Sequence, residues 1–419
     1  MSQAIEEGVV VVGAGCSSAV PILEHLFDDH IGKDGKPNRC KTCEEAADNP
    51  NSKNRRNNVS LLVKHRNGSV LVDVGKTFRT AALEVLRKME PRARVQALLI
   101  THDHADAIMG LDDVRDLQRW ERPRGADGVM NYKTDPLPIY LTQRTFARVK
   151  SCFRYIVDEA ESTAPMRRKV AKLKFNQIDD SLPERDHEEH AQESTRPRFL
   201  APKPGWDSEV ESNICNADRE KEKEKEEAGS FEFPVFEPVA GLRTTALPVW
   251  HGSGYLCLGF LFEGTDAQAE ANGPPASEAN GPSTKSEEGE KEGCEEEAGG
   301  VLYLSDVSAI PLTVLSYLAK RRGKLKLLLC DTLKWDRPHF SHFCAEEAME
   351  LAEWLQPEEL ILVGMDCSVD YEKSNERLAS WIESRREAAE KEGGRPAWRL
   401  QKASLGFDGL SIPLSFTSR

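Results

Sequence analysis

The residues best suited to chemistry are the histidines and aspartates of the run THDHAD. His102 and His104 alternate with Asp103, so in an extended loop both imidazoles point the same way while the intervening carboxylate points elsewhere. Asp106 follows two residues later. Neutral imidazoles and carboxylates suit Zn²⁺, Mn²⁺ or iron, and such an ion supplies a hydroxide nucleophile by lowering the pKa of bound water toward about 7. The run therefore predicts a metal centre that performs hydrolysis.

The surroundings of this run favour a metal centre over an ordinary polar surface loop, which the pattern alone would also fit. The run follows the apolar segment ALLI and precedes GLDDVRDLQ, which is typical of the start of a helix. His251 in PVWHGSG and Asp306 in YLSDV lie further along the chain, where such a site needs more ligands.

The elements that position these side chains are apolar runs that end in a residue of a metal-binding type. Five runs end in this way, at Asp73, His102, Asp306, Asp331 and Asp366. A strand that stops in Asp or His places the side chain on a loop at the edge of a sheet, where a rigid scaffold can bring several of them together.

The pattern of the whole chain predicts a layered α/β domain, because short apolar runs alternate with amphipathic stretches. The expected strands cover residues 9–12, 59–63, 70–72, 97–100, 256–262, 301–304, 325–329 and 360–363. The expected helices cover residues 78–89, 112–120, 143–155, 311–321, 345–355 and 374–390.

Two segments of unusual composition interrupt this pattern. We predict a single domain over residues 1–419, with insertions at 180–230, which contains the run REKEKEKEE, and at 264–300, which is rich in Glu, Ala, Gly, Ser and Pro. Neither segment has regularly spaced apolar residues that could bury a face, so we expect both to be solvated, disordered spacers.

The bulk composition favours a cytoplasmic protein with a small ligand. The 419 residues carry a formal net charge of −14, which argues against a surface that attracts nucleic acid or anionic lipid. The sequence contains no apolar stretch of about 18 residues that could span a membrane. Its ten cysteines are scattered, which favours reduced thiols or metal ligands over a secreted disulfide framework.

Several motifs resemble one known family. THDHADAIMGLDDVRDLQ, GAGCSSAVP, SKNRRNNVSLLV, VLVDVG, PVWHGSGYLCLGF, VLYLSDVS and RPHFSHF are similar to the phosphonate-pathway cyclic phosphodiesterase branch of the metallo-β-lactamase superfamily and to its eukaryotic homologues. The resemblance covers nearly the whole chain outside the two insertions. It implies an α/β fold of the metallo-β-lactamase type, an αββα sandwich in which helices flank two mixed β-sheets and the active site lies at one sheet edge.

The resemblance also implies roles for individual residues around one or two ions of Zn²⁺ or Mn²⁺. It assigns the first metal to His102, His104 and His251, the second metal to Asp106, and the position between them to Asp306. Asp73 would orient the metal-binding loop from behind, and Thr101 would assist it.

Two departures from the family pattern concern the second metal. Ala107 replaces the last histidine of HxHxDH, and Gly364 stands where a later histidine is expected, so this position loses two imidazoles. The second metal site is then empty, binds its ion weakly, or is completed by another histidine. His339 and His342 of RPHFSHF, which are spaced i, i+3, are the candidates. His342 is our candidate proton donor to the leaving group, with His339 as the alternative. A packing or capping role at a helix start is the competing interpretation of both.

Cys40 and Cys43 have the Cys-x2-Cys spacing that presents two thiolates to a tetrahedral zinc ion, and a redox pair is the alternative. The resemblance implies a structural zinc held by three cysteines and one histidine. Here Cys367 stands in place of the family's histidine and His25 in place of a cysteine, so the expected ligands are His25, Cys40, Cys43 and Cys367. Cys16 is a competing ligand, which we interpret as a neighbour in a backbone turn.

The expected function is a metal-dependent hydrolase that cleaves a small, perhaps cyclic, phosphodiester. The same fold also serves β-lactams, thioesters, lactones and RNA, so the fold does not determine the substrate. The alternatives are an RNA-processing nuclease and, because of Ala107 and Gly364, a catalytically weakened metal-binding or interaction protein. We expect neither a membrane nor a nucleic-acid partner, and a homodimer is left open.

Overall fold

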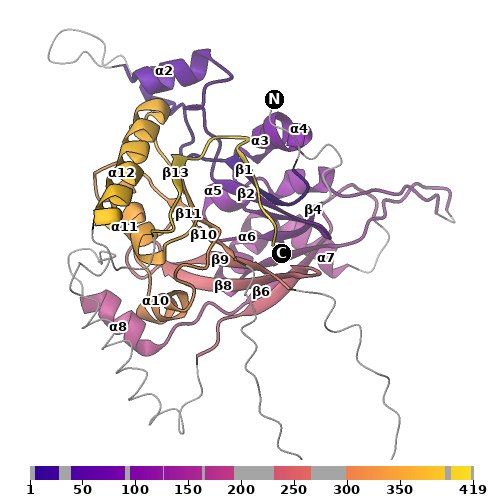
Figure 1. Ribbon diagram of the computed structural model, residues 1–419. Helices are drawn as coiled ribbons and strands as arrows, with labels where there is room; N and C mark the ends of the chain where they lie inside the picture. The colour runs from indigo at the N-terminus through magenta and orange to yellow at the C-terminus, as the bar shows by residue number, and fades with distance from the viewer. Residues whose placement is uncertain are drawn as a thin grey trace, which may run out of the picture.

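Two seven-stranded sheets, packed face to face, form the centre of the protein (Figure 1). The computed structural model describes residues 5–27, 39–89, 95–125, 127–162, 166–192, 231–265, 299–391 and 398–416. Helices cover the outer face of each sheet, so the described part of the chain is an αββα sandwich (Figure 1).

The first sheet has the strand order β14-β1-β2-β3-β4-β5-β6, and β3 to β6 run parallel to one another. Its side chains alternate between two apolar layers, because successive residues of a strand point to opposite faces. Val9 and Val11 pack between the sheets, whereas Val10 and Val12 pack under the outer helices. The strands are β1 (Gly8–Gly13), β2 (Ser60–His65), β3 (Gly68–Val72), β4 (Val95–Leu99), β5 (Leu137–Thr142), β6 (Leu173–Ile178) and β14 (Ser411–Pro413).

The second sheet has the order β13-β12-β11-β10-β9-β8-β7. Strands β10 to β13 are parallel, and β9 is antiparallel to both β8 and β10, so β8 runs in the same direction as β10. The strands are β7 (Val235–Val239), β8 (Leu242–Trp250), β9 (Leu256–Gly264), β10 (Val301–Leu304), β11 (Leu327–Asp331), β12 (Glu359–Val363) and β13 (Lys402–Leu405).

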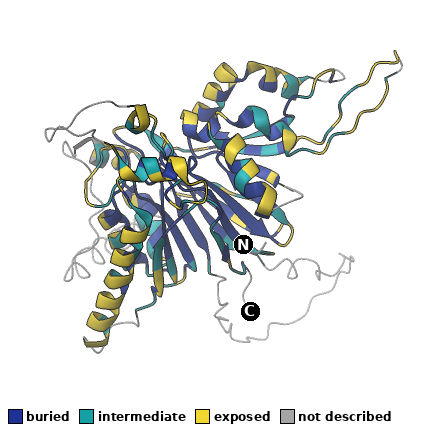
Figure 2. Ribbon diagram, turned by 90° about the horizontal axis from the view of Figure 1, so that it is seen from above, coloured by how far each residue is buried: buried dark blue, intermediate teal, exposed yellow. Residues whose placement is uncertain are grey.

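The helices bury one side and expose the other, as Figure 2 shows by the yellow outer surfaces above the dark blue strands. The first sheet is covered by α3 (Phe78–Ala81), a π-helical turn (Ala82–Leu86), α4 (Arg87–Met89), α5 (Ala105–Ile108), a 3₁₀ helix (Leu111–Asp116), α6 (Gln143–Cys152) and α7 (Arg154–Glu161). The second sheet is covered by α10 (Leu312–Ala319), α11 (Ala345–Leu355) and α12 (Tyr371–Lys391). In the described ranges, no helix combines the length and the apolar character needed to cross a membrane.

The predicted αββα sandwich is confirmed, and every predicted strand is present to within two or three residues at its ends. Two helix predictions need correction. The stretch 112–120 forms the short 3₁₀ helix Leu111–Asp116 instead of an α-helix. The helix expected over 143–155 breaks at Phe153, whose backbone is not helical and whose side chain is buried in the core under the first sheet.

The prediction that residues 180–230 form a disordered spacer is wrong for the first part of that segment, which contains helix α8 (Glu184–Gln192). Asp186 is buried and accepts hydrogen bonds from the backbone N–H and the hydroxyl of Thr313, at 3.2 and 2.6 Å. The His190 ring stacks on Trp250 at a centroid distance of 4.0 Å. Polar contacts thus anchor a helix that has no apolar stripe. Residues 193–230 and most of the predicted insertion 264–300, residues 266–298, lie outside the described residues.

We predict that Asp186→Ala destabilises the fold by about 1–2 kcal/mol, because Asp186 satisfies a backbone donor in the first turn of α10. Urea denaturation followed by circular dichroism measures the change in the free energy of unfolding. Glu188→Ala, at an exposed position of the same helix, is the control and should leave stability unchanged. Equal stability of the two variants would show that α8 does not contribute to the folded core.

Candidate metal centre

The chemically active side chains meet at the carboxyl ends of five strands, β3, β4, β8, β10 and β11. These strands run in the same direction within each sheet, so the residues that follow them lie at one edge. Segments that are far apart in the sequence thereby meet at one place, which is formed by Asp73, His102, His251, Asp306 and Asp331.

Three imidazoles form the first part of this site. The ring centroids of His102 and His104 are 4.6 Å apart, and His251 lies 5.4 and 5.2 Å from them. One nitrogen from each ring lies within 4.8 Å of the others. His102 and His251 are buried, whereas His104 is exposed and lies on the solvent side. The structure therefore brings together the three histidines that the sequence assigned to the first metal.

Hydrogen bonds behind His102 fix the orientation of its ring. Asp73 accepts bonds from the backbone N–H and the hydroxyl of Thr101, at 2.9 and 2.8 Å. Because the hydroxyl proton is used there, the Thr101 oxygen accepts from Nδ1 of His102, at 2.8 Å. This leaves Nε2 of His102 with a lone pair, and that atom is buried without a hydrogen-bond partner. Asp73 and Thr101 thus lie behind the loop that carries His102 and His104.

His251 is oriented in the same manner. Its Nδ1 donates to the carbonyl of Ser341 at 2.7 Å, and a carbonyl can only accept, so the lone pair of the neutral ring is on Nε2. Its backbone N–H donates to the carbonyl of Tyr255 at 2.8 Å, which closes the loop between β8 and β9. Burial and the neighbouring His342 lower the pKa of His251 to about 3, so the ring is neutral. Burial likewise lowers the pKa of His102.

Two buried carboxylates complete the centre. Asp106 lies in the first turn of α5, with one oxygen 3.9 Å from Nε2 of His102. Asp306 follows β10, and its carboxylate forms a group with His102 and Asp106 in which the potential ligand atoms lie within 4.8 Å of one another. Ala107 is packed in the apolar layer under the outer helices and supplies no ligand.

His342 also reaches this cluster, whereas His339 does not. A nitrogen of His342 lies within 4.8 Å of potential ligand atoms of His251 and Asp306. Its Nδ1 donates to Asp331 at 2.9 Å. Burial lowers the pKa of His342, but the charge and hydrogen bond of Asp331 and the charge of Asp306 outweigh it and raise the pKa to about 9.

His339 turns its Nδ1 toward Ser341 instead. This nitrogen accepts from the Ser341 backbone N–H at 3.4 Å and lies 3.2 Å from the hydroxyl of the same residue. The proton of the neutral His339 ring is therefore on Nε2. In His251 and His342, by contrast, Nδ1 carries a proton.

Sequence reasoning missed a polar network on the open side of the site. The Tyr255 ring stacks on His104 at a centroid distance of 4.9 Å, and its hydroxyl donates a short hydrogen bond to Asp103. Arg144 lies over the Tyr255 ring at 3.8 Å, and the Nε atoms of Arg144 and Arg148 are 3.8 and 3.6 Å from Asp103. Asp103 thus points away from the histidines, as the alternation predicted. The spacing of Arg144 and Arg148 on one face of α6 is the only sequence signal that could have identified the pair.

The chemistry of this donor set fits a divalent cation. Neutral imidazoles offer lone pairs, and the buried Nε2 of His102 has no partner within the described residues. Burial raises the pKa of Asp73 to about 8 and that of Asp306 well above its usual range, and the charges of neighbouring aspartates add to both shifts. A cation among them would offset the cost of burying carboxylates and unpaired nitrogens. No ion is part of this structure, so the fit rests on the protein groups alone.

Comparisons with solved structures agree with the architecture. A diphosphatase of the PhnP family matches with a TM-score of 0.53 and 20% identity, over 96% of this chain and 95% of that chain. Zn²⁺-bound PqqB from Methylobacterium extorquens matches with a TM-score of 0.51 and 13% identity, over 97% and 99% of the two chains. The chain has the metallo-β-lactamase fold. No protein-family model matches the sequence, and no curated protein matches it.

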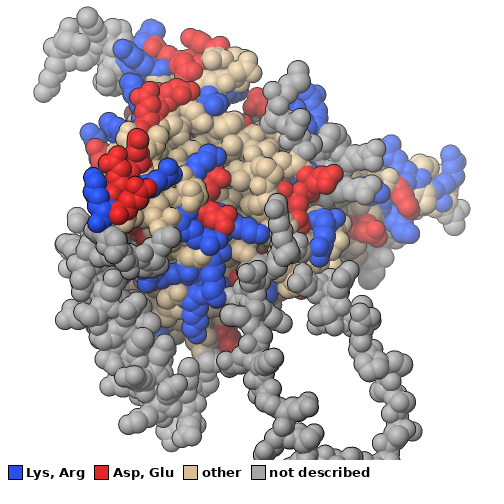
Figure 3. Space-filling view, in the orientation of Figure 1, with Lys and Arg blue, Asp and Glu red and all other residues tan. Residues whose placement is uncertain are grey.

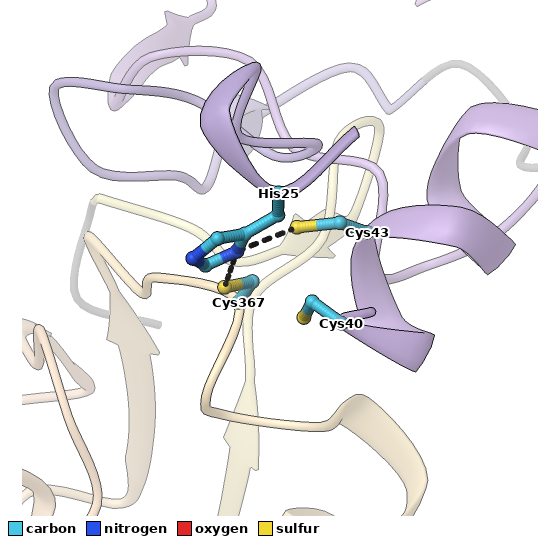
Figure 4. A group of neighbouring side chains, drawn as sticks. All are labelled: His25, Cys40, Cys43 and Cys367. Carbon is cyan, nitrogen blue, oxygen red and sulfur yellow. Dashed lines mark hydrogen bonds between the residues drawn. The ribbon is translucent and has the colours of Figure 1, made fainter. Parts of the chain in front are cut away.

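A second cluster of metal-binding side chains lies outside the central edge of this metallo-β-lactamase fold (Figure 4). Nδ1 of His25, from the short helix α1 (Glu24–Phe27), lies 3.4 Å from Sγ of Cys43 and 3.2 Å from Sγ of Cys367. Cys40 precedes helix α2 (Lys41–Asp48), which carries Cys43, and Cys367 follows β12. All four potential ligand atoms lie within 4.8 Å of one another. The structure thus joins the four residues expected to hold the structural zinc.

The alternatives for this cluster are less well supported by the geometry. Cys40 and Cys43 are both free thiols in this structure. Cys16 lies outside the cluster, with its backbone N–H bonded to the Met365 carbonyl at 3.2 Å, in agreement with a role in a turn. Burial raises the pKa of Cys43, and burial with the neighbouring thiols raises that of Cys367 above the usual range. A bound cation would favour the thiolates.

We predict that Cys43→Ser lowers thermal stability and the zinc content of the purified protein by one ion per chain. The cluster ties the segment before β2 to the loop after β12, and a metal that closes so long a loop stabilises the fold. Differential scanning calorimetry and elemental analysis measure the two effects. The control is Cys152→Ser, an exposed thiol on α6. Unchanged zinc content in the Cys43 variant would contradict the assignment.

Proposed function

We propose that this protein is a metal-dependent hydrolase, with a divalent cation held by His102, His104 and His251 together with the carboxylates of Asp106 and Asp306. One observation carries this proposal: the buried Nε2 of His102 has a lone pair, no hydrogen-bond partner in the described residues, and two other imidazoles beside it. Bound there, Zn²⁺ or Mn²⁺ would activate water and neutralise negative charge on a substrate oxygen.

The protein's own residues hold this arrangement rigid. The Asp73 carboxylate fixes the Thr101 hydroxyl, which in turn fixes the proton of His102 on Nδ1. The Ser341 carbonyl does the same for His251. Such outward hydrogen bonds set the tautomer and direction of a ligating imidazole and increase its basicity.

For the substrate we propose a small phosphodiester. The narrow cluster is formed by buried groups, with only His104 exposed among the three histidines, which favours a small reacting group. The PhnP-family structure with a similar fold is described as a diphosphatase. The formal net charge of −14 disfavours a long polyanion as substrate. On the face seen in Figure 3, Lys and Arg lie next to Asp and Glu, with one group of Lys and Arg below the centre of the view. We place this activity in the cytoplasm, where free thiols such as Cys40 and Cys43 persist.

We propose the neighbouring pair His342 and His339 as the source of the proton for the leaving group, with His342 as the first choice, as expected from the sequence. The hydrogen bond from the Ser341 backbone N–H to Nδ1 leaves the proton of neutral His339 on Nε2. His342 donates its Nδ1 proton to the Asp331 carboxylate, and because its pKa is raised to about 9, the ring carries a second proton on Nε2. The rings of His339 and His342 lie beside each other, with centroids 5.4 Å apart.

We predict that the Zn²⁺- or Mn²⁺-loaded protein hydrolyses bis(p-nitrophenyl) phosphate and that His104→Ala abolishes turnover without altering the circular dichroism spectrum. Removal of one of three imidazoles leaves the cation poorly held, while an exposed side chain contributes little to stability. His187→Ala, an exposed histidine on α8, is the control variant. Turnover of thioester or lactone probes without phosphodiester cleavage would overturn the substrate assignment.

We also predict that His339→Gln lowers kcat for substrates with poor leaving groups more than for p-nitrophenyl esters. A leaving group of low pKa departs without a proton, so loss of a proton donor affects it least. Paired assays with bis(p-nitrophenyl) phosphate and methyl p-nitrophenyl phosphate under saturating metal, compared with a dialkyl diester, measure the difference. Equal losses on all substrates would assign His339 a purely positional role.

A further inference from the structure

The ring of Tyr255 lies beside all three imidazoles of the central site. It is stacked on His104, at a centroid distance of 4.9 Å and an interplanar angle of 28°, and meets His102 and His251 edge-on at 6.3 and 5.7 Å. We propose that Tyr255 is a positioning residue that holds the His104 ring in the direction needed to bind the cation. This inference rests on the proposed function, because it concerns the same cation, but metal binding tests it without turnover.

His104 differs from the other two imidazoles in how its ring is held. Nδ1 of His102 is bonded to the Thr101 hydroxyl, and Nδ1 of His251 to the Ser341 carbonyl. The His104 ring is exposed and makes no hydrogen bond to any residue that the structure describes. An imidazole that rotates freely must be ordered when it binds an ion, and this ordering weakens binding. Stacking on Tyr255 is therefore the contact that can fix the direction of His104.

Tyr255 is itself fixed between the two loops that carry the three imidazoles. Its hydroxyl donates to the carboxylate of Asp103, the residue between His102 and His104, and accepts from the backbone N–H of Asp103 at 3.3 Å. Its carbonyl accepts from the backbone N–H of His251 at 2.8 Å. Tyr255 thus connects the loop after β4 to the loop between β8 and β9, and so fixes His104 relative to His251.

Two arginines of α6 support this connection from the solvent side. The guanidinium of Arg144 lies 3.8 Å from the centre of the Tyr255 ring, within the range of a cation–π contact. The Nε atoms of Arg144 and Arg148 lie 3.8 and 3.6 Å from the Asp103 carboxylate. Because Asp103 is buried, these positive charges offset the cost of the carboxylate that accepts from Tyr255.

The direction of the Tyr255 hydroxyl separates positioning from direct participation in the reaction. The hydroxyl is bonded to Asp103, whose side chain points away from the histidines, so it is not directed toward a reacting group. The ring, by contrast, contacts the proposed ligands. Tyr255 therefore acts through the position of His104 and not as a proton donor.

The test is the affinity of the full-length protein for Zn²⁺ at the central site, measured by competition with a chromophoric chelator after zinc has filled the cysteine cluster. Tyr255→Leu removes the stacked ring and should weaken binding by about 10–100-fold, as is typical for groups that orient a ligand. Tyr255→Phe keeps the ring and loses only the bonds to Asp103, so it should weaken binding by about 2–10-fold. The matched control is Tyr155→Leu, an exposed tyrosine whose hydroxyl also donates to an aspartate, Asp112, at 2.8 Å, and it should bind Zn²⁺ unchanged.

The same substitutions in a His104→Ala background distinguish positioning from a general structural role. If Tyr255 acts through His104, Tyr255→Leu should change the affinity by no more than about twofold once that imidazole is absent. Tyr255→Phe, the smaller structural change, should lose its effect in the same way. Zn²⁺ is used because it binds nitrogen ligands more tightly than Mn²⁺ does, which keeps the affinity of the weakened site measurable.

The outcomes separate this inference from the proposed function. Unchanged Zn²⁺ affinity in Tyr255→Leu, or equal losses with and without His104, would overturn the positioning role alone. If the unsubstituted protein bound no zinc beyond that of the cysteine cluster, the proposed function would fail, and this inference with it. Zinc binding with the expected pattern among the variants, but without phosphodiester cleavage, would refute the proposed substrate and support the role of Tyr255.

Discussion

The burial of carboxylates and neutral imidazoles at one sheet edge is the constraint on which the rest of the site depends. Asp73, Asp106 and Asp306 lie close together in a region of low polarity, and burial raises the pKa of two of them. Such a group is costly unless a positive charge is present, because burial removes the carboxylates from bulk water. The surrounding hydrogen bonds reduce that cost only in part, since they hold the outer atoms of each ligand and leave the inner atoms free.

The metallo-β-lactamase fold creates this constraint through the direction of its strands. In the first sheet, β3 and β4 run in the same direction, and in the second sheet β8, β10 and β11 do. The residues that follow these strands therefore lie at a common edge. Each of these ends is a point where hydrogen bonding of the sheet stops and a side chain can turn inward. Backbone strain accompanies the turn at two of them, because Asp73 and Asp306 have φ of 58° and 52°. Local backbone strain at these two residues thus accompanies the rigid arrangement of the side chains.

Much of this could be predicted from the sequence, because ligand-type residues at strand ends are a local signal. The alternation of His102 and His104, the strand-terminal Asp73 and Asp306, and His251 were all identified in this way, and the structure brings them together. Strands β5 to β8 were not predicted, and two of them, β5 and β6, mix polar residues with apolar ones. The contacts of Ser341 with His251, Tyr255 with Asp103, and α8 with Trp250 join residues that are far apart in the chain, and no local pattern encodes them.

Both candidate metal sites take potential donors from positions that differ from those of the family that the chain resembles. In the cysteine cluster, His25 and Cys367 hold places that the family resemblance assigns to a cysteine and a histidine, so three sulfurs and one nitrogen still surround one point. At the central site, Gly364 supplies no donor while His342 approaches from another loop, with Asp331 in the space that a side chain at 364 would need. A cation responds to the type, number and direction of the atoms around it, and these depend on tertiary contacts.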